Sequence, residues 1–358
     1  MDSGIRSLSS LLIDIDKDWD GHTLTNIKKA IAAGQPLTYE QMIAVVGFAW
    51  TGETDEDSCY GLTQDADYVY AGLGTSPAKV IKIAKSTMTT SATWTGETGE
   101  DICRAITQDN DFVYAGLYPS PAKVIKIAKS TMTTSATWTG ETGEDICYSL
   151  TQDATFVYAG LDTSPAKVIK ITKSTMATSA TWTGETGEDS CRALAQDTDF
   201  VYAGLYLSPA KVIKITKSTM VTSATWTGET GENSCYGLTQ DATFVYAGLG
   251  TSPAKVIRMF KSTMATFQTW IGEGYEDICR AITQDNDFVY AGLYLSPARV
   301  IKITKSTMLA FATLTGESGE NNCYGLTQDA DYVYAGLGTS PARVIKIDNR
   351  RHFPHFYQ

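Results

Sequence analysis

The sequence predicts an all-β protein, a closed β-propeller of seven blades with four strands in each blade. The first observation behind this prediction is a period of 44 residues, set by the seven cysteines Cys59, Cys103, Cys147, Cys191, Cys235, Cys279 and Cys323. Seven prolines repeat with the same spacing, from Pro77 to Pro341, and so do six tryptophans, from Trp50 to Trp270. This period is typical of four-stranded blades but lies close to that of helical repeats, so the local sequence must decide.

Four β-prone segments fill each repeat, as residues 94–138 illustrate. The segments "CRAIT" (103–107), "FVYAGL" (112–117), "KVIKI" (123–127) and "TSATW" (134–138) are rich in β-branched and aromatic residues. Turn-forming sequences "QDND", "YPSP" and "KSTM" separate them, and "GETGED" precedes the first. No apolar stripe with helical spacing runs through the repeat. Four strands in each of seven repeats indicate a seven-bladed propeller.

The two ends of the repeat array predict how the ring closes. The last repeat reaches "RVIKI" at residues 343–347 and then stops, so its fourth strand is missing. The stretch "AVVGFAW" at residues 44–50 aligns with "MTTSATW" and supplies an extra fourth strand at the front. We expect residues 44–50 to complete the seventh blade, because this would remove the free edge of an open array. The chain then divides into an arm (1–43), a propeller (44–347) and a tail (348–358).

Composition and charge exclude several classes of protein. Hydrophobic residues make up 43% of the chain and charged residues 19%, which is typical of a globular fold. The net charge of −11 argues against a nucleic-acid partner, whose phosphates need a basic surface. No apolar run is long enough to span a membrane, and the N-terminus does not read as a signal peptide. An odd number of evenly spaced cysteines predicts buried thiols rather than disulfides or a zinc site.

The repeat itself has a family resemblance. The segment "DFVYAGLYPSPAKVIKI" at residues 111–127 resembles bacterial propeller repeats of the form D-x-x-Y-x-G-x-x-x-S-P-G-K-V-x-K-I. This resemblance extends over residues 50–347, and the Trp-Asp signature of WD-repeat proteins is absent. It implies the propeller fold and says little about function, because one fold serves many functions.

The arm carries a second resemblance. Residues 16–42, "DKDWDGHTLTNIKKAIAAGQPLTYEQM", are similar to the neck segment of phage tail fibres, although the Lys-Tyr-Val of those segments is absent. The resemblance implies a virion component, often trimeric, that is attached through residues 1–43. Such a protein is released by lysis and is found in the virion or outside the cell; a cytoplasmic location is the alternative.

Metal and catalytic sites are not predicted. Residues 16–21 match the start of an EF-hand calcium loop, but its twelfth position is Ile27 rather than a glutamate. The three histidines, His22, His352 and His355, lie outside the repeats, so no Ser/His/Asp or Cys/His set can form within a blade. We therefore expect no cofactor, no metal and no enzymatic activity; an enzyme that uses the central channel as its pocket is a weaker hypothesis.

Two positions alternate between odd and even repeats. The residue after each cysteine is Tyr60, Arg104, Tyr148, Arg192, Tyr236, Arg280 or Tyr324, and the residue after "AGL" is a tyrosine in the even repeats, at Tyr118, Tyr206 and Tyr294. In a propeller the first strand is innermost, so we expect a ring of four tyrosines and three arginines at the channel mouth, with the other tyrosines on the same face. The "GETGED" loops should add an acidic rim there: Glu56, Glu100, Glu144, Glu188, Glu232, Glu276 and Glu320.

Each of these features has a functional and a structural interpretation. The ring is interpreted either as a ligand-binding surface or as tyrosine–arginine stacking between blades. The "QDAD" and "QDND" aspartates are expected to form Asx turns on the opposite face, and the tryptophans to pack between blades. The leading functional hypothesis is a non-enzymatic module that binds a cell-surface glycan or a protein receptor. The alternative is a cellular scaffold that recruits proteins.

Overall fold

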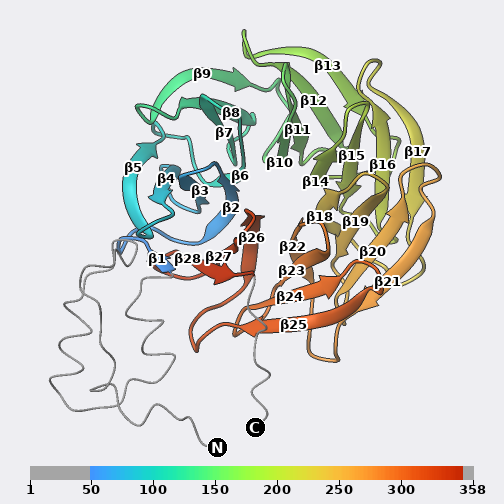
Figure 1. The fold of residues 1–358 in the computed structure, drawn as a ribbon. Helices are drawn as coiled ribbons and strands as arrows, with labels where there is room; N and C mark the ends of the chain where they lie inside the picture. The colour runs from blue at the N-terminus through green and yellow to red at the C-terminus, as the bar shows by residue number, and fades with distance from the viewer. Residues whose placement is uncertain (1–48, 350–358) are drawn as a thin grey trace, which may run out of the picture.

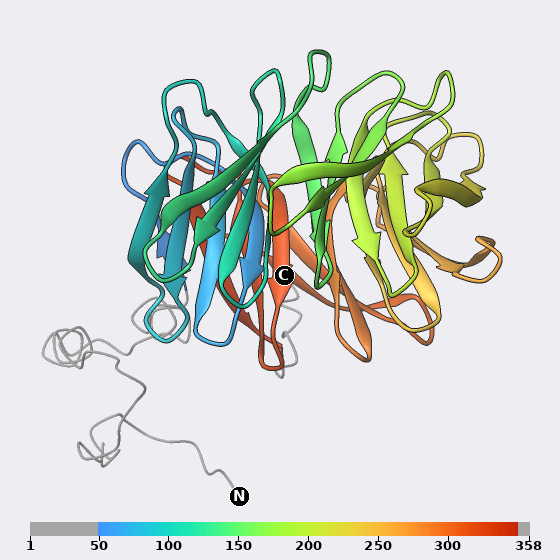
Figure 2. The ribbon, with the colours of Figure 1, turned by 90° about the horizontal axis from the view of Figure 1, so that it is seen from above.

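The computed structural model describes residues 49–349, and these form seven four-stranded antiparallel sheets without a helix. The sheets are arranged around a central axis (Figure 1), and the strands run between the two faces of the ring (Figure 2). The predicted seven-bladed propeller is therefore confirmed.

Each blade contributes four strands in order from the axis outward. The innermost strands are β2 (Cys59–Gln64), β6 (Cys103–Gln108), β10 (Cys147–Gln152), β14 (Cys191–Gln196), β18 (Cys235–Gln240), β22 (Cys279–Gln284) and β26 (Cys323–Gln328). The second strands are β3 (Tyr68–Leu73), β7 (Phe112–Leu117), β11 (Phe156–Leu161), β15 (Phe200–Leu205), β19 (Phe244–Leu249), β23 (Phe288–Leu293) and β27 (Tyr332–Leu337). The third strands are β4 (Lys79–Ala84), β8 (Lys123–Ala128), β12 (Lys167–Thr172), β16 (Lys211–Thr216), β20 (Lys255–Phe260), β24 (Arg299–Thr304) and β28 (Arg343–Asp348). The outer strands are β5 (Thr89–Thr95), β9 (Thr133–Thr139), β13 (Ala177–Thr183), β17 (Val221–Thr227), β21 (Thr266–Ile271), β25 (Leu309–Thr315) and β1 (Ala49–Thr51).

The ring closes through β1, the first described strand. It pairs antiparallel with β28, with Trp50 opposite Val344, and gives the seventh blade the order β1-β28-β27-β26. The prediction that an N-terminal strand completes the last blade is confirmed. Residues 44–48 of the predicted strand, the arm at residues 1–43 and most of the tail lie outside the described residues.

The hydrophobic core lies between blades rather than within them. One buried cluster joins Tyr70, Val80 and Trp94 of the first blade to Cys103 and Val113 of the second. Other buried clusters around the ring join neighbouring blades in the same way. A single blade therefore cannot bury its own apolar side chains, and its stability depends on both neighbours.

The glycine of each "AGL" sequence is required by the cysteine of the next blade. A Cβ atom added to Gly116 would lie 2.5 Å from Cys147 Sγ, which is closer than side chains pack. All seven cysteines are free and fully buried, as the sequence predicts. Burial raises the pKa of Cys103 to about 12, so this thiol is not reactive near neutral pH.

The outer strands are joined by tryptophan–threonine hydrogen bonds. Trp94 Nε1 donates to Thr134 Oγ1 of the next blade at 2.9 Å. The same bond is formed by Trp50, Trp138, Trp182 and Trp226. The predicted packing of the tryptophans between blades is confirmed.

A second set of bonds joins the blades at the face formed by the turns between first and second strands. Asp65 Oδ1 accepts the backbone N–H of Tyr68 at 2.9 Å, which confirms the predicted Asx turn. Its Oδ2 accepts hydrogen bonds from the Tyr70 hydroxyl at 2.9 Å and from Lys129 Nζ of the next blade at 3.0 Å. Burial alone would raise the pKa of Asp65, but the Lys129 and Tyr70 hydrogen bonds hold it below its usual value.

Gly116→Ala should destabilise the protein by about 1–3 kcal/mol, because the new methyl group overpacks the contact with Cys147. Thermal and denaturant unfolding of the single variants and of Gly116→Ala/Cys147→Ala measure the coupling between the two sites. The double variant should recover part of the loss. Strictly additive effects would show that the glycine is not required by the cysteine.

The midpoint of thermal unfolding should be nearly constant from pH 7 to pH 5 and should fall below about pH 4. The pKa values of Asp65, Asp109 and their counterparts are lowered in the folded state, so the unfolded chain binds more protons in this range. Stability is therefore lost as the pH falls through the folded pKa values. Calorimetry from pH 7 to pH 2 tests this, and Asp65→Asn should flatten the acid limb.

Candidate ligand-binding face

The predicted ring forms at one end of the central channel. Its seven members, here called the Tyr/Arg ring, are Tyr60, Arg104, Tyr148, Arg192, Tyr236, Arg280 and Tyr324, and all are half-buried. Each is the second residue of an innermost strand, and these strands surround the axis in Figure 1. The loops before the first strand and after the second lie together at this end, since Ala122 N donates to Glu144 O at 2.6 Å. We call this end the axial face.

Cation–π and ring contacts connect the members of the Tyr/Arg ring. The Arg104 guanidinium carbon lies 4.2 Å from the ring centroid of Tyr60 and 5.2 Å from that of Tyr148. Arg192 lies 3.9 Å from the Tyr148 centroid. Arg280 lies 4.7 Å from the Tyr236 centroid and 5.4 Å from that of Tyr324. The predicted stacking of tyrosine on arginine between blades is therefore confirmed.

The junction between the seventh and first blades differs from the others. Because seven is odd, Tyr324 and Tyr60 are neighbours there, with ring centroids 4.9 Å apart. No arginine separates them. The Tyr/Arg ring is therefore cationic around the second, fourth and sixth blades and purely aromatic at this junction.

The three loop tyrosines lie against the Tyr/Arg ring on the same face, as predicted. The Tyr118 ring stands edge-on to Tyr148 of the next blade, with centroids 6.4 Å apart. The corresponding distances are 5.8 Å for Tyr206 to Tyr236 and 5.9 Å for Tyr294 to Tyr324. Tyr118, Tyr206 and Tyr294 remain 39%, 44% and 40% exposed, so each presents an aromatic surface to solvent.

A steric contact couples the two alternating positions in three of the four blades that have an inner tyrosine. A Cβ atom at Gly74 or Gly250 would lie 2.6 Å from a ring carbon of Tyr60 or Tyr236 in the same blade, and Gly338 meets Tyr324 in the same way. The third blade is the exception, because Asp162 stands at this position beside Tyr148. Sequence reasoning noted the alternation but did not assign this role to the glycines.

The predicted acidic rim is wrong for the seven glutamates named above. They are only 4–6% exposed. Glu100 Oε2 accepts the backbone N–H of Glu97 at 3.0 Å, and its Oε1 pairs with Lys123 Nζ at 2.9 Å. These buried glutamates hold the loops in place through hydrogen bonds and ion pairs, and they do not form a solvent-exposed rim.

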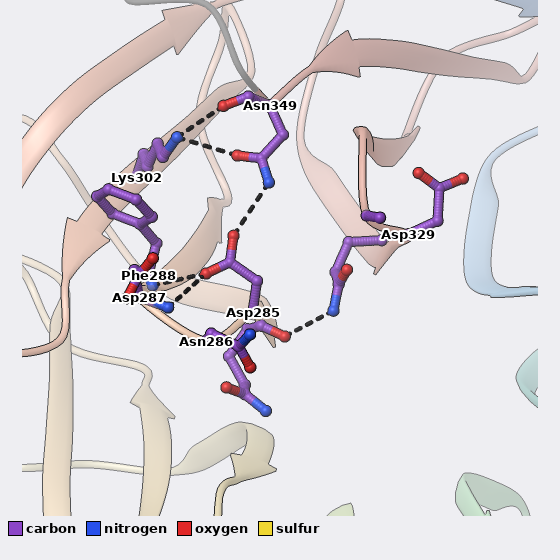
Figure 3. Close-up of a pocket in the computed structure, with 10 residues that line it drawn as sticks. Asp285, Asn286, Asp287, Phe288, Lys302, Asp329 and Asn349 are labelled. Atoms are coloured by element: carbon purple, nitrogen blue, oxygen red, sulfur yellow. Dashed lines mark hydrogen bonds between the residues drawn. The ribbon is translucent and has the colours of Figure 1, made fainter.

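The described chain also has hollows between blades on the opposite face. Figure 3 shows one of about 550 Å³ between the sixth and seventh blades. Its central groups are bonded to one another: Asn349 Nδ2 donates to Asp285 Oδ2 at 3.0 Å, and Lys302 Nζ donates to the Asn349 backbone carbonyl at 2.8 Å. This hollow is a blade junction whose polar groups serve the fold.

At the junction of the sixth and seventh blades, a hydrogen bond replaces the lysine–aspartate ion pair that joins the other neighbouring blades of the described chain. Lysines Lys85, Lys129, Lys173, Lys217, Lys261 and Lys305 each pair with an aspartate of the preceding blade. Asn349 takes the seventh position, so Asp285 receives a neutral hydrogen bond instead. The sequence contains this signal, since 349 follows 305 by one period, but Asn349 lies beyond the predicted propeller, residues 44–347.

Residues 49–349 contain no group of three His, Cys, Asp or Glu side chains placed to hold a metal. Within the same residues, no helix is long and apolar enough to cross a membrane. The histidines and the calcium-loop-like stretch fall outside this part of the chain.

Comparison with known proteins supports the fold alone. No protein-family model and no curated protein matches the chain. Among solved structures, the crystal structure of the computationally designed Ika8 protein is similar, with a TM-score of 0.59 and 13% sequence identity over 83% of this chain and 98% of that chain. At this identity the likeness carries no information about ligand or activity.

Asn349→Lys should stabilise the protein by about 1 kcal/mol, because it supplies the ion pair that the other six junctions have. The thermal midpoint should rise at low salt and the gain should shrink at high salt. Lys305→Asn is the matched control, because it creates a second neutral junction and should lower the midpoint. An unchanged midpoint in Asn349→Lys at low salt would contradict the role given to these pairs.

Proposed function

We propose that the protein is a non-enzymatic binding module that recognises a cell-surface glycan or a protein receptor through its axial face. The observation that carries the proposal is the set of exposed aromatic rings, Tyr118, Tyr206 and Tyr294, held beside the arginines of the Tyr/Arg ring. Tyrosine supplies a rigid apolar face and a hydroxyl, a combination enriched where proteins bind other molecules.

The chemistry of the axial face favours binding over catalysis. Burial raises the pKa of its tyrosines Tyr148, Tyr236 and Tyr324, so these hydroxyls stay protonated near neutral pH. The repeat cysteines, the strongest nucleophiles in the blades, are fully buried. Sites repeated around a ring suit several simultaneous weak contacts, and such contacts raise the overall affinity.

The likeness of the arm to phage tail-fibre necks and of the blades to bacterial propeller repeats supports a virion setting. In this proposal residues 1–43 attach the propeller to the particle, and trimerisation there multiplies the number of axial faces. The protein would then act in the virion or outside the cell. The rival proposal is a cellular scaffold, which would recruit its protein partners in the cytoplasm rather than at a cell surface.

Removing the three exposed tyrosines should abolish recognition. The triple variant Tyr118→Ala, Tyr206→Ala and Tyr294→Ala should lose at least tenfold in affinity for glycans that the native chain binds, since each lost aromatic contact costs about 0.5–1.5 kcal/mol. A glycan array followed by calorimetry on the full chain measures this.

Phe267→Ala is the control, because Phe267 is a comparably exposed aromatic side chain, 48% exposed, in the outer strand β21 and outside the loops of the axial face. It should leave binding unchanged. Glycan binding that survives the triple substitution would contradict the proposal. A native chain that binds no glycan on the array would exclude the glycan class and leave only a protein receptor.

A further inference from the structure

The three arginines of the Tyr/Arg ring have no acidic partner. Two other arginines of the described residues do have one: Arg299 pairs with Glu276 at 3.3 Å and Arg343 with Glu320 at 2.7 Å, whereas Arg258 donates to Gln268 Oε1 and to the Lys305 backbone carbonyl. Within residues 49–349, no carboxylate oxygen lies within 4.0 Å of a guanidinium nitrogen of Arg104, Arg192 or Arg280. Other described cations without an ion pair, such as Lys82, Lys126 and Arg258, donate to backbone carbonyls instead, and no such bond to the described residues is formed by the three arginines of the Tyr/Arg ring.

Their hydrogen-bonding edges are also unused. Arg192 donates one bond, from Nε to Ser190 Oγ at 3.0 Å. Arg104 and Arg280 donate none to the described residues, and their contacts are to tyrosine rings. A guanidinium that lies over an aromatic ring keeps its five N–H donors in the plane of the group. The rings therefore hold the arginines in place and leave their donors available.

The three charges act on one another across the channel mouth. Burial lowers the pKa of Arg280, and the charges of Arg104 and Arg192 lower it further. Such repulsion costs free energy in the empty site and is relieved when a negative charge binds. Because the members of the Tyr/Arg ring are half-buried, the attraction to a bound anion is screened less than at a fully exposed site.

We propose that the mouth of the central channel is a binding site for an oxyanion, held by the N–H edges of Arg104, Arg192 and Arg280. Planar guanidinium groups match the paired oxygens of carboxylate, sulfate and phosphate. The aromatic junction of Tyr324 and Tyr60 offers a stacking surface beside these cations, so the ligand carries an apolar ring face as well as the charge. Resting on the function proposed above, the carrier is an acidic sugar.

The test uses the full chain and three probes at constant ionic strength: sialyllactose, lactose and inorganic sulfate. Calorimetry should show sialyllactose binding at least tenfold more tightly than lactose. The variant Arg104→Gln/Arg192→Gln/Arg280→Gln should reduce sialyllactose binding to the level of lactose and abolish sulfate binding. Arg258→Gln is the control, because Arg258 stacks on Phe244 at 3.7 Å in the third strand of the fifth blade, away from the Tyr/Arg ring.

A second variant separates a loss of ligand binding from a loss of folding in the first variant. Arg104→Lys/Arg192→Lys/Arg280→Lys keeps the charges but lacks the planar donors, so sialyllactose affinity should fall severalfold while thermal stability is retained. Equal binding of sialyllactose and lactose, or sialyllactose binding that neither variant changes, would overturn the oxyanion site and leave glycan recognition standing. Sulfate binding through the arginines with no binding of either sugar would keep the oxyanion site and exclude the acidic sugar as its carrier.

Discussion

The close approach of each blade to the next is the constraint on which the structure depends. The second strand of one blade meets the cysteine of its neighbour so tightly that glycine is required, as at Gly116 and Cys147. Apolar clusters fill the rest of each junction, and hydrogen bonds join its margins: tryptophan to threonine at the outer strands, lysine to aspartate at the turns. Since no blade completes its own core, each junction adds to the stability of the array, and the last junction includes Trp50 of β1. Ring closure thus gives the first and last blades the second neighbour that they would otherwise lack.

The repeated features of the chain could be predicted from its sequence, and the features that depend on side-chain register could not. The 44-residue period and its turn residues predicted the blades, and the missing fourth strand of the last repeat predicted the role of β1. The Tyr/Arg ring could be placed because the first strand of a blade is innermost. The buried glutamates were misjudged, since "GETGED" reads as a solvated turn and its partner lysine lies 23 residues farther along the chain. Asn349 was missed because its role appears only when the lysine pairs of the other blades are seen together.

The positions that differ between blades give the axial face of this propeller its distinctive chemistry. Most positions repeat closely in all seven blades and serve packing, whereas the axial face follows a two-blade pattern on an odd-numbered ring. Seven blades cannot alternate strictly between tyrosine and arginine, so Tyr324 and Tyr60 are direct neighbours at one junction. The arginines lie in the second, fourth and sixth blades. A ligand on the axis would meet an aromatic side and a cationic side, and this gives a nearly symmetric scaffold a direction for recognition. At Tyr60, Tyr236 and Tyr324 a glycine after "AGL" makes room for the ring, because a Cβ atom there would lie 2.4–2.6 Å from a ring carbon.

The pairing of β1 with β28 also has a consequence for synthesis on the ribosome. Trp50 lies opposite Val344, so one of the first strands to emerge has one of the last as its partner. At about 5–20 residues per second, the two residues are made roughly 15–60 s apart. Six blades can assemble in order as the chain emerges from the ribosome. During this time β1 has no partner strand, and its free backbone groups can pair with another strand. The nascent propeller is therefore open until β28 has been made, and the rate of translation sets the duration of this stage. A chain that is released before β28 would lack the partner of β1 and stay open.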